Sequence, residues 1–311
     1  MDPQPVPDLI PTSGPDRGLA LPHRPGPLEV GAIDDLVGAA VDAQMGHIRL
    51  DVPWTLAQPT ATRVDGSVFE ALAAASSAAR AAGLTVWFRL LQPDVPRWFD
   101  NDGGFGDDRT ASTYWPRWVD LVSGRLGDHA DGWVPFEAPF GLVGRLAPEN
   151  PRRQGELLHH LVVAWRDSWR LLRGVVPVAT SLDLAIERPA DERPESVAEA
   201  RRRDDMRWYT WFGGLRDGVE RIPGRAERVL DGLDRSCDQM GVALAADTAQ
   251  ERDLEDLLAR VGEQRLHMPL AITLRAVGSS AGERQESIER FETRLAAVGG
   301  EAGLVRLTLL R

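Results

Sequence analysis

The sequence predicts a single α/β domain folded as a (β/α)8 barrel, and three observations support this prediction. Eight short apolar or β-branched runs alternate with longer segments of helical periodicity, which is the pattern of parallel strands joined by crossover helices. A length of 311 residues is common for such a barrel folded as one unit. No G-x-G-x-x-G motif follows the first expected strand, which disfavours an open dinucleotide-binding sheet.

The expected strands and helices alternate along almost the whole chain. The expected strands, of which the first is the weakest, cover residues 18–21, 47–52, 85–91, 132–136, 175–186, 239–245, 269–275 and 304–310. The expected helices cover residues 33–44, 69–82, 112–126, 154–173, 225–236, 251–261 and 284–298. The polar segment 187–203 contains two prolines, which indicate a long loop leading into a helix.

We expect the barrel to occupy residues 18–311 and a flexible, proline- and glycine-rich N-terminus to occupy residues 1–17. This N-terminus lacks the basic and apolar regions of a secretory signal, which favours a cytoplasmic protein. No apolar run approaches the length needed to cross a bilayer. Because the sequence ends just after the eighth expected strand, we expect a truncated C-terminus, with the last barrel helix short or missing, and shortened loops elsewhere.

Composition excludes several classes of function. The net charge of −11 argues against nucleic acid as the main partner, because phosphate binding needs a clustered basic surface. All 36 basic residues are arginine, so Schiff-base chemistry and a P-loop lysine are excluded. The single cysteine, Cys237, excludes an internal disulfide and is expected to be an inert thiol.

The active site of such a barrel forms at the carboxyl ends of its strands, and Glu137 is the best candidate acid there. It follows an apolar run at the end of the fourth expected strand, where desolvation is expected to raise its pKa. The alternative is a glutamate of the barrel rim paired with an arginine. A retaining glycosidase needs two such carboxyl groups, roughly 5–5.5 Å apart.

Other side chains near the strand ends are candidates for binding a substrate. They are Arg49, Trp54, Gln92, Asp94, Trp98, Asp183 and Arg275. Trp54 and Trp98 could stack on the apolar face of a sugar ring, although core packing is the more common role of a tryptophan. Arg275 either lies at the reacting centre or points outward to pair with an acid.

No metal or cofactor site is expected. The sequence has six histidines but no H-E-x-x-H or H-x-H motif. His159 and His160 are neighbours on a helix, so their side chains face different directions. His47 opens the second expected strand, at the end of the barrel associated with stability rather than catalysis.

Several segments, in order and at the right spacing, resemble glycoside hydrolase family 1, the β-glucosidase family. The segments are MGHIRLDVPW at 45–54, LLQPDVP at 90–96, GGF at 103–105, HHL at 159–161, RWY at 207–209 and DQMGV at 238–242. They are similar to the family's G-x-x-x-Y-R-F-S-I-x-W, L-Y-H-W-D-L-P, G-G-W, H-H-L, R-W-F and D-F-x-G-V motifs. The resemblance implies the barrel fold, and a saccharide or a glycosylated small molecule as the ligand.

The catalytic positions depart from the family's pattern. The acid/base motif T-F/L-N-E-P is replaced by PFEAP at 135–139, so Ala138 stands in the place of the glutamate and Glu137 in the place of the asparagine. The nucleophile motif I-T-E-N-G is replaced by ITLRA at 272–276, so Leu274 stands in the place of the nucleophile. Gln92 replaces a histidine that binds the sugar, and the family's final W-S-L-x-D-N-F-E-W motif is absent.

Two hypotheses about function follow. The first is a catalytically inactive member of this family that uses the barrel for binding or assembly, because alanine cannot donate a proton and leucine cannot attack an anomeric carbon. The second is a divergent glycosidase or a recruited barrel enzyme, in which Glu137 is the general acid or base and Asp94, Asp183 or Glu187 is its partner. Neighbouring residues of a regular strand face opposite ways, which weighs against the second hypothesis. A metal-dependent hydrolase is a third and weaker alternative.

Overall fold

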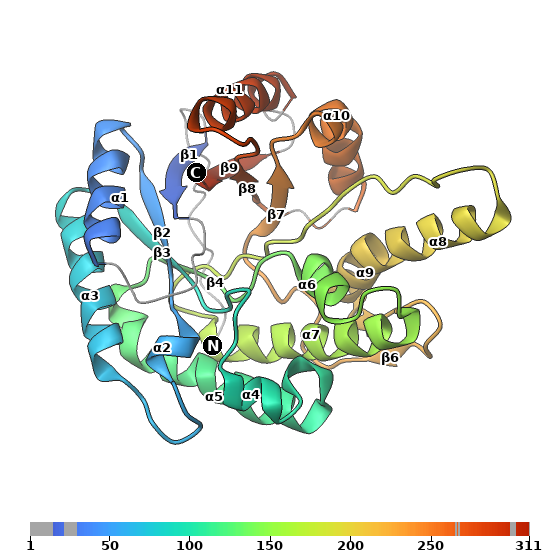
Figure 1. Cartoon of the computed structure of the whole chain (residues 1–311), viewed down its shortest axis with the longest axis horizontal. Helices are drawn as coiled ribbons and strands as arrows, with labels where there is room; N and C mark the ends of the chain where they lie inside the picture. The colour runs from blue at the N-terminus through green and yellow to red at the C-terminus, as the bar shows by residue number, and fades with distance from the viewer. Residues whose placement is uncertain (1–14, 22–29, 265, 267, 299–302, 311) are drawn as a thin grey trace, which may run out of the picture.

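The computed structural model describes residues 15–21, 30–264, 266, 268–298 and 303–310 (Figure 1). Its main sheet has seven parallel strands in the order β4-β3-β2-β1-β9-β8-β7. These strands are β1 (Asp16–Ala20), β2 (His47–Asp51), β3 (Thr85–Arg89), β4 (Gly132–Val134), β7 (Met240–Ala245), β8 (Leu270–Arg275) and β9 (Leu304–Leu310). Each one overlaps a strand that the sequence predicts.

Residues 178–182 close the sheet into a barrel between β4 and β7. On one side, the Ala179 amide donates to the Trp133 carbonyl over 2.8 Å. On the other side, the Leu182 amide donates to the Gly241 carbonyl over 2.9 Å. A side chain at position 241 would collide with the Thr180 carbonyl oxygen, so the close approach of the two backbones requires glycine there. The fifth expected strand therefore exists as a bridging segment, and the (β/α)8 barrel is confirmed.

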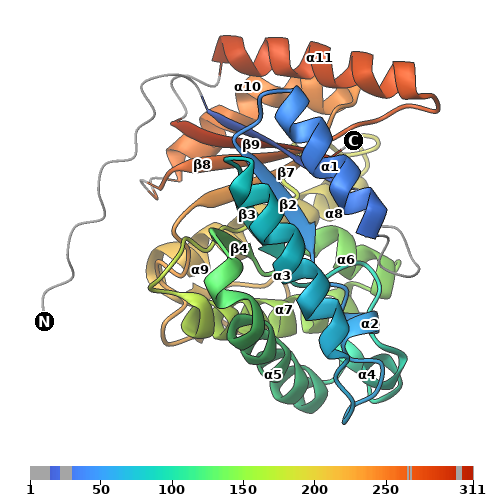
Figure 2. The same cartoon turned by 90° about the vertical axis from the view of Figure 1, so that its left-hand side faces the viewer.

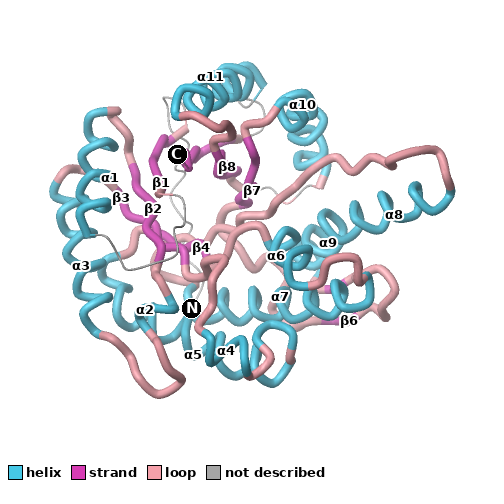
Figure 3. Tube along the Cα trace, in the orientation of Figure 1, coloured by secondary structure: helices cyan, strands magenta, loops and turns pink. Residues whose placement is uncertain are grey.

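Helices surround the strands, as Figure 3 shows. They are α1 (Val30–Asp42), α2 (Trp54–Ala57), α3 (Gly66–Ala81), α4 (Arg97–Asn101), α5 (Asp108–Leu126), α6 (Pro139–Leu146), α7 (Pro151–Leu172), α8 (Pro194–Asp204), α9 (Thr210–Asp217), α10 (Thr248–Glu263) and α11 (Ala281–Val298). The side view in Figure 2 shows α1 and α3 next to each other over β2 and β3. In the described residues, no helix is long and apolar enough to span a membrane.

The helix expected at residues 225–236 is wrong. This segment contains turns and the short strand β6 (Arg228–Val229), which pairs antiparallel with β5 (Val219–Glu220). Gly232 and Arg235 have positive φ angles of 72° and 53°, which a helix does not allow. The helical residues of this part of the chain lie earlier, in α8, the π-helical turn η3 (Asp205–Tyr209) and α9. The loop expected at 187–203 does lead into this helix, although α8 already begins at Pro194.

The boundary expected between residues 17 and 18 falls inside β1, which begins at Asp16. Residues 1–14 of the expected N-terminal segment lie outside the described residues. Alternating residues of each strand point to opposite faces, and the two faces differ in chemistry. The outward face and the helices share a continuous apolar core, whereas the inward face carries many polar and charged side chains.

Candidate binding site at the barrel mouth

Two buried arginines line the upper part of the barrel interior, near the carboxyl ends of the strands. Arg49 lies on β2 and donates through Nη1 to the Thr273 hydroxyl of β8 over 2.9 Å, so its side chain lies across the barrel interior. Arg89 lies on β3 and contacts the Asp51 carboxylate at 2.8 Å and 2.5 Å. Both guanidinium groups are almost completely shielded from solvent, so each needs an opposite charge close by.

Glu137 supplies the opposite charge that the two arginines share. Its carboxylate lies 2.8 Å from Arg49 Nη2 and 3.2 Å from Arg89 Nη1. The Ser181 hydroxyl lies 3.5 Å from Oε2, the carboxylate oxygen that also contacts Arg49. Only 12% of the Glu137 side chain is exposed. Glu137 thus does face the barrel interior, and the arginine pairing foreseen for a rim residue occurs inside the barrel.

The charge state of Glu137 differs from the expectation. Burial alone would raise the pKa of this carboxyl group, as the sequence suggested. The charges of Arg49 and Arg89, the hydrogen bond from Arg49 and the charge of Arg275 oppose burial and hold the pKa below its ordinary value. The expected rise in pKa is therefore wrong, and Glu137 is an ionised carboxylate at neutral pH.

The end of β8 offers no carboxylate. Its last residues, with the one that follows, are Thr273, Leu274, Arg275 and Ala276. Thr273 points into the barrel, where it meets Arg49, and Arg275 shares this face because it lies two residues further along the strand. Leu274 is completely buried in the apolar core on the opposite face. Its side chain therefore packs against the helical layer. It does not point into the barrel mouth, which is the opening of the barrel at the carboxyl ends of its strands.

A second polar cluster involves Asp183 and the helix α6. Asp183 Oδ1 accepts a hydrogen bond from the Phe140 amide over 3.0 Å, and Oδ2 accepts one from the Gly141 amide over 2.7 Å. These amides belong to the first turn of α6, whose own N-cap residue, Ala138, has no side-chain acceptor and a left-handed φ of 53°. Asp183 therefore caps a helix that follows a neighbouring strand.

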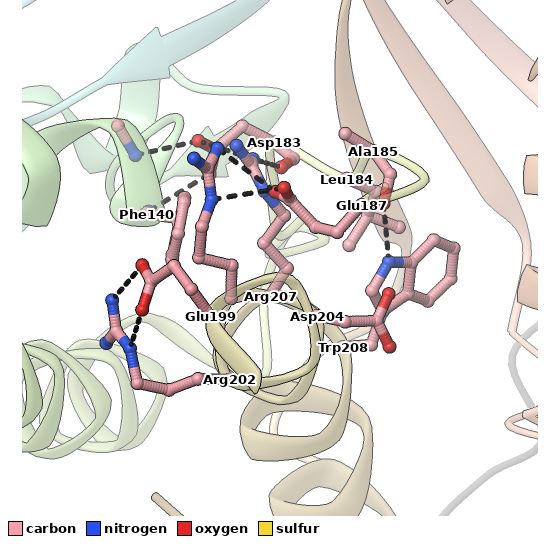
Figure 4. Close-up of polar contacts among 12 residues, drawn as sticks. Phe140, Asp183, Leu184, Ala185, Glu187, Glu199, Arg202, Asp204, Arg207 and Trp208 are labelled. Atoms are coloured by element: carbon pink, nitrogen blue, oxygen red, sulfur yellow. Dashed lines mark hydrogen bonds and ion pairs between the residues drawn. The ribbon is translucent and has the colours of Figure 1, made fainter. Parts of the chain in front are cut away.

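Arg207 of η3 holds this cluster together (Figure 4). It donates to the Asp183 carbonyl and contacts the Glu187 carboxylate. Its guanidinium group also lies 4.0 Å from the centre of the Phe140 ring. Burial raises the pKa of Asp183, while Arg207 and the two α6 amides oppose this rise. Asp183 and Glu187 are thus engaged by Arg207, whereas Glu137 is engaged by Arg49 and Arg89.

The two candidate stacking residues lie in different surroundings. Trp54 is completely buried, and its ring stacks on Trp118 with centroids 5.3 Å apart. A platform that includes Trp54 is therefore wrong, because neither ring face is open to a sugar. Trp98 is partly buried, donates to the Gln58 carbonyl and meets Trp54 edge-on. Both indoles belong to an aromatic cluster beside the mouth.

The third strand's candidates, Gln92 and Asp94, also differ in exposure. Gln92 is buried and donates to the Arg89 carbonyl over 3.1 Å, while its carbonyl oxygen accepts from the Trp54 amide over 3.3 Å. These bonds fix the backbone between β3 and α2. Asp94 is exposed on the loop that follows β3.

The lower part of the barrel interior holds a hydrogen-bonded chain that the sequence did not reveal. Arg306 of β9 lies 3.6 Å from the centre of the Trp87 ring and donates to Thr308 over 3.4 Å. His47 lies between Thr308 at 2.8 Å and Asp16 at 2.9 Å. Burial lowers the pKa of His47, so its ring is neutral, donates to Asp16 and accepts from Thr308. Polar residues at every second position of β2 and β9 were the sequence feature that could have predicted this chain of contacts.

The two neighbouring histidines of α7, His159 and His160, form hydrogen bonds with different partners. His159 Nδ1 lies 2.8 Å from Glu220, and Arg228 lies 3.0 Å from its Nε2. His160 Nδ1 lies 2.7 Å from the Phe105 carbonyl. Among the described residues, no group of three histidine, cysteine or acidic side chains could hold a metal ion.

Comparison with solved structures places the fold among β-glycosidases. The β-glycosidase from Pyrococcus horikoshii matches with a TM-score of 0.77 and 15% identity over 90% of this chain and 74% of that chain. The β-glucosidase from Exiguobacterium marinum matches with a TM-score of 0.75 and 12% identity over 90% and 78%. The family 1 β-glucosidase from Thermotoga maritima matches with a TM-score of 0.71 and 13% identity over 90% of this chain and 76% of that chain. No protein-family model matches the sequence.

At these identities the comparison establishes the fold: the chain has the barrel architecture of family 1 β-glucosidases. This agrees with the motifs found along the sequence.

Proposed function

We propose that this protein is a non-hydrolytic barrel of the glycoside hydrolase family 1 type, which binds a ligand at its mouth without cleaving a glycosidic bond. The observation that carries the proposal is the ion pairing of Glu137 with Arg49 and Arg89 at 2.8 Å and 3.2 Å. A carboxylate held in this way accepts hydrogen bonds and has no proton to donate to a leaving group.

The sequence around the other catalytic position supports the same proposal. If the segment 272–276 corresponds to the family's nucleophile motif, no residue in it can attack an anomeric carbon. Ala138, in the place of the acid/base glutamate, contributes only its backbone. A double displacement needs both carboxyl groups, so the loss of both removes the mechanism and not merely part of the rate.

The test is hydrolysis of a panel of aryl β- and α-glycosides by the purified protein, with the Glu137→Gln variant as the control. We expect no release of the aryl group above the rate of the variant. Turnover at a normal enzymatic rate that disappears in Glu137→Gln would overturn the proposal.

One observation favours a second candidate function, a divergent glycosidase that uses Glu137 and Asp183. The surroundings of these two carboxyl groups shift their pKa values in opposite directions, downward for Glu137 and upward for Asp183. Such a separation is typical of a base and its partner acid. The Ala138 amide donates to the Ser181 carbonyl over 2.8 Å, so the two segments meet at the same edge of the barrel.

This second function predicts that Asp183→Asn and Glu137→Gln each abolish the same glycoside turnover. Because both oxygens of Asp183 already accept backbone amides of α6, we favour the first proposal. If the wild type cleaves a glycoside and both variants lose this turnover while remaining folded, the second function is supported.

A further inference from the structure

We propose that His159, Glu220 and Arg228 form a pH-sensitive clamp, which holds the hairpin of β5 and β6 against α7 and releases Arg228 when the His159 ring takes up a proton. The clamp lies in the outer layer of the barrel, so this inference does not depend on what the barrel mouth binds. It makes the order of one surface segment depend on pH.

The clamp joins three elements through short polar contacts. His159 Nδ1, on α7, lies 2.9 Å and 2.8 Å from the two carboxylate oxygens of Glu220, on β5. His159 Nε2 lies 3.0 Å from Arg228 Nη1, on β6. Glu220 and Arg228 are directly opposite each other in the hairpin. The imidazole therefore connects both strands to the helix, and Figure 1 shows β6 beside α7.

The partners determine the protonation state of the ring in this arrangement. A guanidinium group has hydrogens to donate and no acceptor, so His159 Nε2 accepts in its contact with Arg228. The single hydrogen of the neutral ring is then on Nδ1, which donates it to Glu220. The clamp thus combines a carboxylate, a neutral imidazole and a guanidinium group, and its charges cancel.

A second proton on the ring breaks one of these contacts. Both nitrogens of an imidazolium are donors, so Nε2–H would face the donor groups of Arg228, and two positive charges would repel each other. The contact with Glu220 would persist as an ion pair. His159 and Glu220 are buried, whereas Arg228 is exposed and can turn into solvent. Arg228 is therefore the group that leaves.

Other charged or titratable groups near the ring have contacts of their own. The His160 ring lies 5.6 Å from the His159 ring, and its Nδ1 contacts the Phe105 carbonyl. Glu156, three residues earlier on α7, pairs with Arg152 and Arg153. The alkyl chain of Arg225 lies against Gly155, one turn earlier on the helix. Among the described residues, the polar contacts of the His159 ring are thus those with Glu220 and Arg228.

The hairpin is short enough to depend on this clamp. Its two strands pair through only two residue pairs, Val219 with Val229 and Glu220 with Arg228. A two-stranded ribbon is marginally stable in water unless it packs against another element. The Leu230 amide, which donates to the Gly218 carbonyl over 2.8 Å, lies directly after β6. Its hydrogen exchange therefore reports on the pairing of the two strands.

The experiment measures hydrogen exchange of the Leu230 amide at about pH 8 and about pH 5.5, on either side of the range in which histidine takes up a proton, with correction for the intrinsic exchange rate. We expect protection in the wild type to be at least about fivefold lower at the lower pH, because one hydrogen bond to a charged group is lost.

Two variants make the test specific to His159. Glutamine at this position can donate to Glu220 and accept from Arg228 but does not titrate, so we expect His159→Gln to give the same protection at both pH values. The matched control is His160→Gln, which changes the neighbouring histidine that contacts Phe105. We expect this variant to retain the pH dependence of the wild type.

A second measurement reads the ring itself. Nitrogen-15 NMR of the imidazole, assigned by the loss of its signals in His159→Gln, should show the Nδ1–H form at about pH 8. An Nε2–H ring would overturn the inference. Protection of the Leu230 amide that does not change with pH in the wild type, or that falls equally in His159→Gln, would also overturn it.

Discussion

Arg49 and Arg306 are both enclosed in the barrel, but their charges are compensated in different ways. Arg49 forms an ion pair with Glu137 at 2.8 Å and a hydrogen bond with Thr273 at 2.9 Å. Arg306 lies against the Trp87 ring and contacts the neutral Gln239 and Thr308 side chains. A buried charge is costly unless an opposite charge is close. The two arginines should therefore contribute differently to stability.

Replacing each arginine by methionine tests this difference. We expect Arg49→Met to lower the free energy of unfolding by about 3–5 kcal/mol, because it leaves Glu137 buried with less compensation. We expect Arg306→Met to leave the free energy of unfolding unchanged or to raise it by up to about 1 kcal/mol, because it removes a poorly compensated charge. Urea denaturation monitored by circular dichroism measures both, and equal losses would contradict this account.

For the single residue Glu137, the sequence predicted its place at the barrel mouth but could not predict its charge state. The arginines that lower its pKa come from β2 and β3, which lie 88 and 48 residues earlier in the chain. Only the barrel brings these residues together. Desolvation, the one effect visible in the local sequence, has the opposite sign.

The start of helix α6 depends partly on neighbouring residues in the sequence and partly on a residue far along the chain. Helix α6 begins at Pro139, as its proline at the first position favours. Its cap, however, is Asp183, which is 43 residues from Phe140 in the sequence. The N-cap position itself holds Ala138, so the usual local signal of a capping side chain is missing.

The role of Asp183 can be tested by replacing it. We expect Asp183→Ala to lower the free energy of unfolding by about 1–3 kcal/mol, because two amides and Arg207 lose their acceptor. Asp183→Asn, which retains one acceptor oxygen, should cost less. Hydrogen exchange of the first turn of α6 should accelerate in Asp183→Ala, and unchanged protection there would argue against capping.

The register of β8 leads to another prediction. Leu274 packs in the apolar layer between the strands and the helices, so Leu274→Glu buries a charge and should cost about 3 kcal/mol or more in unfolding free energy. The variant should not become a glycosidase. Leu274→Met, which keeps the volume, should unfold close to the wild-type temperature in a thermal melt. A stable, glycoside-cleaving Leu274→Glu variant would show that residue 274 faces the mouth.

Secondary structure was predictable where periodicity was strong and failed where turns interrupted it. The strands in β2, β3, β7, β8 and β9 overlap their expected ranges. The helix expected at 225–236 fails because Gly232 and Arg235 take positive φ angles, which break the helical path. The fifth strand forms only isolated bridges, one from Val178 to Trp133 of β4 and two, from Ala179 and Leu182, on the side of β7.

For the whole molecule, the barrel is closed and its interior carries polar and charged side chains in both its lower and its upper part, together with a small apolar cluster of Trp87, Val134 and Ala179. Asp16, His47 and Arg306 occupy the lower part, and Arg49, Arg89 and Glu137 occupy the upper part. The fold followed from alternation along the chain, whereas the network inside it depends on contacts among β1, β2, β3, β8, β9 and the segment that follows β4. The sequence could therefore predict the barrel but not the pairing of charges within it.

The pKa of Glu137 also couples this network to pH. Because the folded state holds this pKa below the ordinary value of 4.5, the unfolded chain takes up the proton first as the solution is acidified. The ion pairs of Glu137 thus stabilise the fold fully above pH 4.5. Their contribution is lost as the pH falls through the lower pKa of the folded protein.

The measurement that tests the central claim most directly is the titration of Glu137 by carboxyl carbon-13 NMR in glutamate-labelled protein. The Glu137→Gln variant assigns the signal by its disappearance. We predict that this carboxyl group remains ionised from pH 8 down to about 4.5 and takes up a proton only below that value. A midpoint above 4.5 would mean a carboxylic acid ready to protonate a leaving group, and would contradict the account of Glu137 as the counter-charge of two arginines.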